Sequence, residues 1–420
     1  MKKLLVLLTA FALVVAFTAP AMAIDHVFGG YWRTRAYMQK NFTGEDDTGA
    51  KDLSQVDTRT RVYYTAKFSD NFKFVNKFEL DAVWGGEEDP AKGWDSQYGD
   101  IGTDGVRVEV KNSYADFGLG NWNFKLGAQG VVLARGFLFD DDCAGAVVTY
   151  NAEGFSLPFL WIKPYEGGAG KDANDQDVDY YAFAPSFNLG ESATIKPTLV
   201  SATSKDGSAW AKLAALGTVP GDNVGVYIIG FDLDAKLDFG TVWLSAYLEN
   251  GEIGDYDVSA WLIGAGSSMK MGPAGFHAQI LYATGDDDAT DEDINAFTVP
   301  AGNCYYWAEI MGYGTFDNQV SSGSPADNIS NLMAFNIGAS FNPIEKLTAT
   351  IDLWYASLVE DDANGEDKLG TELDIKFTYK LLPNLNLDVV GAYLFAGDAT
   401  WDGDDDANPY EVGTRLSLSF

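Results

Sequence analysis

Apolar and polar residues alternate one by one along most of this chain. The segment LTATIDLWY at 347–355 places Leu, Ala, Ile, Leu and Tyr on one side and Thr, Thr, Asp and Trp on the other, and TELDIKFTYK at 371–380 alternates in the same way. A period of two residues is typical of β-strands with two different faces. The pattern therefore predicts an all-β protein.

The connections between the alternating segments follow a second regularity, because short and long ones take turns. Short connections are expected at 69–71, 118–121, 151–154, 188–192, 238–241, 270–275, 342–346 and 382–385. Long, Gly-rich and acidic connections are expected at 41–57, 86–104, 134–142, 165–176, 203–223, 249–256, 284–329, 360–369 and 397–409. This alternation predicts eighteen strands, with both chain ends on the side of the short turns.

An even number of strands with short turns on one side and long loops on the other is typical of outer-membrane β-barrels. In lipid every backbone N–H and C=O must be paired, so a β protein has to close on itself. We therefore predict one transmembrane antiparallel up-and-down β-barrel over residues 24–420, with short periplasmic turns and long acidic extracellular loops. The segment 304–314 also alternates, but a nineteenth strand would put the chain ends on opposite sides, so we expect it inside the 284–329 loop, folded into the mouth.

The N-terminus predicts export. Two lysines, an apolar run from Leu4 to Phe17 and the small residues at 21–23 have the order of a secretory signal peptide that is cleaved after Ala23. No later apolar run is long enough to span a membrane as a helix, although 46% of the chain is apolar. These residues are better explained by strands that face lipid.

The last alternating strand, 410–420, ends on Phe420. We expect it to close the barrel by pairing with the first strand near 27–39, which places the terminal aromatic ring in the interfacial belt. Such an ending is also what the barrel assembly machinery would read, and the expected surroundings are outer-membrane lipid and lipopolysaccharide. A soluble β-sandwich is the alternative, but it leaves the alternation of turn lengths unexplained.

The net charge of −33 excludes the usual basic footprint of a nucleic-acid-binding protein. Acidic runs lie at 45–47, 87–89, 140–142, 286–288, 291–293, 360–362 and 402–406, all in expected outside loops. The simplest interpretation is solvated loops near an anionic surface. A calcium site at Asp286, Asp288, Asp291 and Asp293 is the sharper alternative, although the spacing is not that of an EF-hand. No other cofactor is expected.

Arginine is rare and unevenly placed, because none of the seven lies between 136 and 414. In a closed barrel the last strand neighbours the first, so all seven would occupy one sector of the wall. Alternation turns them and nearby lysines inward, where a charge avoids the cost of about 2–4 kcal/mol at the lipid midplane. The predicted solute track consists of Arg33, Arg35, Arg59, Arg61, Lys73, Lys77, Arg107, Lys111, Lys125 and Arg415.

Two interpretations of this track remain open. Inward carboxylates such as Glu79 and Asp81 on the same strands could make it a salt-bridged ladder that stiffens the wall. Alternatively, it lowers the barrier for anions, as charged ladders do in pores. Opposite it we expect a wall with few bases, lined by Asp177, Asp179, Asp232, Asp234 and Asp238. The predicted function is passive diffusion of small polar, mainly anionic, solutes through this polarised lumen.

Catalytic and metal-binding motifs are missing from the sequence. The only histidines are His26 and His277, and of these His277 is the single candidate base for an enzyme at the outer rim. We therefore expect no enzyme. Cys143 and Cys304 both fall at the outside mouth, where one disulfide would pin the 284–329 loop over the pore.

Three stretches carry a family resemblance: YWRTRAYMQKNFTG, RTRVYYTAKFSDNFKFVNKFELD and LGTELDIKFTYKLLPNLNLDVVGAYLFAGDA. They resemble the alginate-export-type porins of Gram-negative bacteria. The resemblance implies an eighteen-stranded barrel with an arginine-rich lumen for anionic sugars or small organic anions. Export of an acidic polysaccharide and a barrel sheath around a periplasmic electron carrier remain alternatives, and so do a monomer and a homotrimer.

Overall fold

The computed structural model describes residues 24–46, 52–86, 99, 101, 107–167, 177–205, 223–288, 291–298, 302–401 and 407–420. Its strands and 3-10 turns are β1 (Asp25–Lys40), β2 (Leu53–Ser69), β3 (Phe72–Val83), β4 (Glu109–Leu119), β5 (Trp122–Leu133), η2 (Ala134–Gly136), β6 (Phe139–Ala152), β7 (Phe155–Tyr165), β8 (Val178–Phe183), β9 (Ser186–Leu189), β10 (Ala193–Ser204), β11 (Val224–Leu237), β12 (Gly240–Ile253), β13 (Tyr256–Met271), β14 (Ala274–Ala283), β15 (Asp293–Ile294), β16 (Leu332–Ile344), β17 (Leu347–Ser357), β18 (Lys368–Leu382), β19 (Leu385–Ala396), η3 (Asp398–Thr400) and β20 (Tyr410–Ser419). The predicted signal peptide, 1–23, lies outside the described residues.

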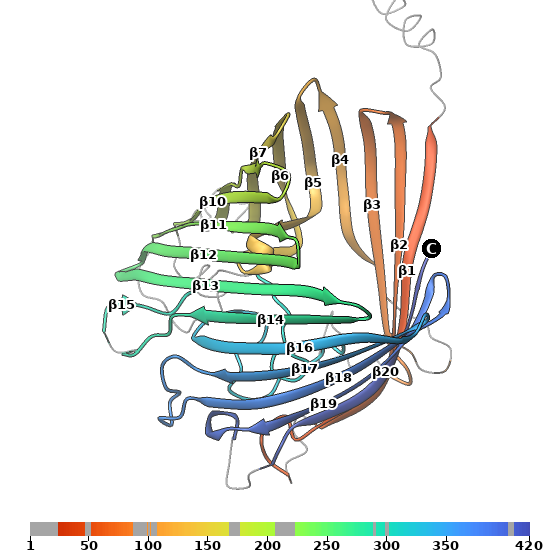
Figure 1. Cartoon of the computed structure of the whole chain (residues 1–420). Coiled ribbons are helices and arrows are strands. Elements are labelled where there is room, and N and C mark those ends of the chain that lie inside the picture. The colour runs from red at the N-terminus through yellow and green to blue at the C-terminus, as the bar shows by residue number, and fades with distance from the viewer. Residues whose placement is uncertain are drawn as a thin grey trace, which may run out of the picture.

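The strands form one closed antiparallel barrel (Figure 1). Each wall strand pairs with its neighbours in the chain, and β20 pairs with β1, so that no edge is left open. β8 and β9 are two halves of one wall strand, because both pair with β7 and with β10. The two-residue β15 only adds to the end of β13. Eighteen wall strands remain, which confirms the predicted number.

The eight tight turns also lie where the sequence predicted them. They occupy 70–71, 120–121, 153–154, 190–192, 238–239, 272–273, 345–346 and 383–384. Two long connections were predicted wrongly. The expected loop at 249–256 is a two-residue turn at 254–255, because β12 and β13 are 14 and 16 residues long and stay paired up to this turn. The expected loop at 134–142 is shorter, since β6 begins at Phe139.

The two faces of the wall differ as the alternation predicts. On β16, Phe335 and Ile337 are 46% and 63% exposed on the outside, whereas Asn336 between them is 4% exposed on the inside. Large apolar side chains recur on the outer face of the other strands, and their burial there requires lipid. Among the described residues, no helix is long and apolar enough to cross a membrane.

The closing strand behaves as predicted. Tyr31 to Lys40 on β1 pair with Ser419 to Tyr410 on β20. The backbone of Phe420 continues this pairing, since its N–H donates to the Gly30 carbonyl at 3.1 Å and its carbonyl accepts from the Gly30 N–H at 2.8 Å. The C-terminus therefore lies beside β1, as Figure 1 shows.

The apolar core lies inside the barrel. The largest cluster of buried apolar side chains combines inward residues of the wall with Phe137, Leu138 and residues of the long connection between β14 and β16. We call residues 302–331 the inner loop. It contains no strand, so 304–314 belongs to a loop as expected, and several of its apolar side chains, including Ile310 and Phe316, are completely buried. The barrel is consequently filled in part by its own chain.

Candidate functional site: a charged lumen crossed by the inner loop

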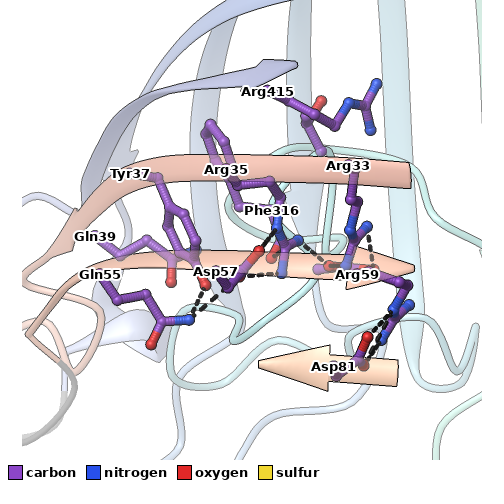
Figure 2. Close-up of polar contacts among 12 residues, drawn as sticks. Arg33, Arg35, Tyr37, Gln39, Gln55, Asp57, Arg59, Asp81, Phe316 and Arg415 are labelled. Atoms are coloured by element: carbon purple, nitrogen blue, oxygen red, sulfur yellow. Dashed lines mark hydrogen bonds and ion pairs between the residues drawn. The ribbon is translucent and has the colours of Figure 1, made fainter. Parts of the chain in front are cut away.

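Arginines on β1 and β2 find their counter-ions directly across the strand pairs. Arg35 faces Asp57, and its Nε and Nη2 donate to the two carboxylate oxygens at 2.9 and 2.6 Å (Figure 2). Arg59 on β2 faces Asp81 on β3 and donates at 2.8 and 2.5 Å in the same fork geometry. The strand register sets these bidentate pairs, which are the strongest form of arginine–carboxylate contact.

The neighbouring arginines follow the same rule. Arg61 lies opposite Glu79 and donates to it. Arg415 on β20 lies opposite Asp388 on β19 and donates to it at 2.9 Å. Arg35, Arg59, Arg61 and Arg415 thus each donate to a carboxylate on a neighbouring strand, which is the arrangement that the ladder interpretation describes.

Arg33 differs because the wall offers it no carboxylate. Its register partners are Arg59 on β2 and Ser417 on β20. Asp317 of the inner loop supplies the missing negative charge, accepting hydrogen bonds from Arg33 at 3.2 and 3.4 Å and one from Arg35. Burial alone would raise the pKa of the Asp317 carboxyl, but the charges of Arg33 and Arg35 outweigh burial and lower that pKa below its ordinary value.

Packing holds the tip of the inner loop against β1 and β20. The ring of Phe316 stacks on Tyr37 with 4.7 Å between ring centroids and 6° between ring planes, and the Phe316 carbonyl accepts from Arg35 at 2.7 Å. A Cβ on Gly413 would lie 2.6 Å from the Phe316 ring and 2.4 Å from the Tyr37 Cβ. Glycine at this position is therefore needed for the loop to reach the wall.

Further contacts carry the inner loop across the lumen. The Cys304 N–H donates to the Gly136 carbonyl of η2 at 3.0 Å, and Tyr305 stacks on Phe137 with 4.2 Å between centroids. On the other side Glu372 of β18 accepts the backbone N–H groups of Ile310 and Met311 at 2.6 and 3.0 Å. The loop is thus anchored at η2, β18 and β1.

The predicted disulfide is not formed, because Cys143 and Cys304 are both free thiols. Cys143 lies on β6, while Cys304 lies in the inner loop. Burial raises the pKa of the Cys304 thiol to about 12, which keeps it protonated and unreactive. The anchors named above hold the inner loop in place of a disulfide.

The lysines extend the positive charge along β3, β4 and β5. Lys73 pairs with Asp116 at 3.2 Å. Lys77 and Lys111 share one carboxylate, that of Asp142, at 3.3 and 3.6 Å. Lys125 lines an interior cavity of about 420 Å³ and has no ion-pair partner among the described residues. These four lysines therefore contact only two carboxylates, those of Asp116 and Asp142, among the described residues.

Two details of this region correct the prediction. The acidic run 140–142 is part of β6 and not of an outside loop, which is how Asp142 can reach the lysines. Arg107 precedes the first residue of β4, so it belongs to the connection before the strand.

We call the inward cations of β1–β5 and β20 the basic wall.

The far wall, on β8 to β11, also differs from the prediction of a surface with few bases. Arg135 of η2 reaches Asp234 and Asp232 on β11 at 2.6 and 3.6 Å. Lys163 of β7 pairs with Asp177 at 2.5 Å and with Asp179 at 3.4 Å. The lumen is therefore less polarised from side to side than the sequence suggested.

A second cavity, of about 470 Å³, lies between the inner loop and β14 to β18. It contains His277, whose ring nitrogen lies 2.5 Å from Asp352, and it is also lined by Trp307, Asp374 and Lys376. His277, the candidate base for a rim enzyme, thus lies inside the lumen, where its ring nitrogen is hydrogen-bonded to the Asp352 carboxylate.

The acidic segment after β14 shows local contacts. Asp286 and Asp291 each accept a backbone N–H two residues further along, from Asp288 at 3.3 Å and from Asp293 at 2.9 Å. Within the described ranges, no group of three or more His, Cys, Asp or Glu side chains is arranged to hold a metal ion.

Comparison with known proteins supports the fold. The alginate-export family model matches residues 228–414, less than half of the chain; this range includes the stretch at 369–399 but neither N-terminal stretch that carried the resemblance. No curated protein matches the sequence. OccAB4 of Acinetobacter baumannii superimposes with a TM-score of 0.60 at 11% identity, covering 94% of this chain and 98% of that chain.

Two structures from Pseudomonas aeruginosa give the same result. OccK9 (OpdG) has a TM-score of 0.60 at 13% identity and covers 94% of this chain and 99% of its own. OpdQ has a TM-score of 0.58 at 11% identity and covers 94% and 98%. Together with the closed wall and its apolar outer face, these matches confirm the predicted fold, an eighteen-stranded antiparallel barrel of the porin type. The match to the alginate-export model agrees with the resemblance found in the C-terminal part of the sequence.

Proposed function

We propose that this barrel is a passive channel for small anionic solutes, which diffuse along the basic wall past the inner loop. The observation that carries the proposal is the incomplete pairing of the lysines on β3 to β5, where Lys77 and Lys111 share one carboxylate and Lys125 has no ion-pair partner among the described residues. A ladder that served only as a strut would need one counter-ion for each cation. Excess charge facing a lumen lowers the barrier for ions of the opposite sign.

Exposure separates the parts of the basic wall. The side chains of Lys73 and Lys111 are 44% and 26% exposed, whereas those of Arg33 and Arg35 are only 9% and 7% exposed beneath the inner loop. A solute that follows the open part would meet lysines and the arginines of β2 first. The deepest arginines would be reached only next to Asp317.

The test is the reversal potential of the purified protein in a planar bilayer under a potassium chloride gradient. We expect anion selectivity, and we expect Lys111→Gln/Lys125→Gln to reduce it, since this variant removes charge without leaving any carboxylate unpaired. Lys270→Gln, at the exposed tight-turn end of β13, is the matched control and should change nothing. Cation selectivity of the unmodified protein would refute the proposal.

Export of an acidic polysaccharide is a second candidate, favoured by the match to the alginate-export model. A polymer would have to displace the inner loop, which is anchored on three sides. If a polymer passes through the barrel end first, uronate oligomers should block the current through a planar bilayer for longer as their length increases. The sheath for an electron carrier is not favoured, because the inner loop occupies the space that a partner would need.

A further inference from the structure

Charges on β19, β20, β1, β2 and β3 form rows across the strands, and one row is incomplete. In the row through Arg35, the order is Asp388, Arg415, Arg35 and Asp57, so two cations face two carboxylates. In the next row Arg33 and Arg59 face only Asp81. This row therefore carries one positive charge more than it has carboxylates, and Arg33 is the arginine in it that no carboxylate of the wall contacts among the described residues.

Asp317 fills this position from outside the wall, and it fills it imperfectly. Its contacts with Arg33 measure 3.2 and 3.4 Å, whereas the fork pairs within the wall measure 2.5–3.1 Å. Asp317 contacts Arg35 more closely than it contacts Arg33. The Nε of Arg33, a residue only 7% exposed, is buried without a hydrogen-bond partner. A buried guanidinium N–H without an acceptor is costly, and a better-placed oxygen would satisfy it.

A cavity gives access to this arginine. It has a volume of about 130 Å³ and is lined by three arginines, Arg33, Arg35 and Arg59, and three aspartates, Asp57, Asp81 and Asp317. Arg59 and Asp81 at its mouth are about one-quarter exposed, so the cavity opens to the lumen. Its volume corresponds to about four water molecules at roughly 30 Å³ each, enough for a carboxylate group.

We propose that Arg33 is a carboxylate-binding site and that Asp317 is its resident, exchangeable counter-ion, which the carboxylate of a permeating solute displaces. The exchange conserves charge, because one carboxylate leaves the three arginines as another arrives. Displacement also removes the ion pairs of Asp317 with β1. The tip of the inner loop is then held there only by the hydrogen bond from Arg35 to the Phe316 carbonyl and by the stacking of Phe316 on Tyr37, so that binding of the solute loosens the obstacle in its path. Competition with Asp317 then selects carboxylates over simple halides, because a spherical halide ion cannot accept the two parallel hydrogen bonds of a guanidinium fork.

This inference rests on the proposed function, and conductance in potassium acetate tests it. Asp317→Asn keeps the size of the side chain and removes its charge, so acetate no longer has to compete with it. We expect the acetate concentration at half-maximal conductance to fall about tenfold, the equivalent of losing one charge-assisted hydrogen bond. Asp81→Asn is the matched control, since it removes one charge from the same cavity but from the wall.

A second measurement detects the movement directly. Ser321 lies four residues after Asp317, is 1% exposed and has a hydroxyl without a hydrogen-bond partner, so Ser321→Cys is a mild change. In a Cys143→Ser/Cys304→Ser background, acetate should accelerate thiol labelling at this position about tenfold over chloride at equal ionic strength. Adding Arg33→Gln should abolish the acceleration of labelling by acetate. Adding Asp317→Asn should make the thiol at position 321 react rapidly in chloride alone.

The outcomes separate the two proposals. Equal effects of Asp317→Asn and Asp81→Asn, or labelling that acetate does not change, would overturn the exchange while leaving an anion channel intact. Cation selectivity in potassium chloride would overturn the proposed function, and acetate-dependent labelling could still support a carboxylate site at Arg33.

Discussion

Across β1, β2 and β3, Arg35, Arg59 and Arg61 each face a carboxylate fixed by the strand register. On the far wall, by contrast, Asp232 and Asp234 receive their closest positive charge from Arg135, which reaches them from a turn outside the wall. Arg35 and Asp57 are partners in the backbone ladder itself. Arg135, by contrast, comes from a 3-10 turn with a positive φ of 57° and crosses to Asp234 on β11.

This difference teaches which charges should support the fold and which should tune the lumen. A pair set by register, buried and bidentate, is held by the same hydrogen bonds that hold the barrel, so breaking it leaves a buried charge behind. A pair that includes exposed partners, such as Asp234 at 41% exposure, can be replaced by water at little cost. The basic wall should therefore respond to mutation mainly in stability where it is covered, and the far wall mainly in selectivity.

The largest effect is expected for Arg35→Gln. The change leaves Asp57, whose side chain is 10% exposed, without its counter-ion and also removes the donor to the Phe316 carbonyl. Unpairing one buried charge costs about 3–5 kcal/mol in the free energy of unfolding. Urea unfolding in lipid vesicles, followed by tryptophan fluorescence, measures it. The double variant Arg35→Gln/Asp57→Asn should recover much of the loss, and no recovery would show that the pair is not the cause.

Gly413→Ala should have the next largest effect. The new Cβ would press on Phe316 and on Tyr37, and forcing extra volume into a packed site costs about 1–3 kcal/mol. Gly391→Ala on the adjacent strand β19 is the control, because a Cβ there meets only one atom, at 3.9 Å. The same unfolding experiment should separate the two variants. Equal stability would mean that the inner loop is not tightly seated on β1.

Strand number, turn positions and the inward direction of the arginines followed from the sequence, because alternation and turn chemistry are local and the lipid penalty for charge is large. The errors in the fold come from the ends of strands. β6 and β12 continue through residues with acidic or Gly-rich sequences, and pairing with a neighbour outweighed the local turn preference there.

The site was harder to predict for a different reason. Asp317 and Phe316 belong to a segment of the chain that carries no strand pattern, and their partners Arg33 and Tyr37 are about 280 residues away. The sequence placed Arg135 in the same sector of the wall as the other six arginines, although a turn with positive φ carries it to the far wall. One signal was available in the sequence. Inward Tyr37 is the register partner of Gly413 on the last strand, and the missing side chain of this glycine leaves space beside Tyr37 for a large apolar side chain from elsewhere in the chain.

The smallest effect on stability is expected for Arg135→Gln, and this variant tests the far wall directly. Asp234 would be hydrated by water from the lumen, and the loss of the guanidinium from the Trp243 ring, 4.9 Å from its centroid, adds little, so the free energy of unfolding should fall by about 1 kcal/mol or less. Selectivity should nevertheless shift toward cations, because Asp232 and Asp234 would lose their main counter-ion. Lys196→Gln is the matched control, since Lys196 also faces Asp234, but at 3.8 Å and with 48% exposure, and it should shift the reversal potential less. A loss of stability as large as that of Arg35→Gln would mean that both walls are held by their charges in the same way.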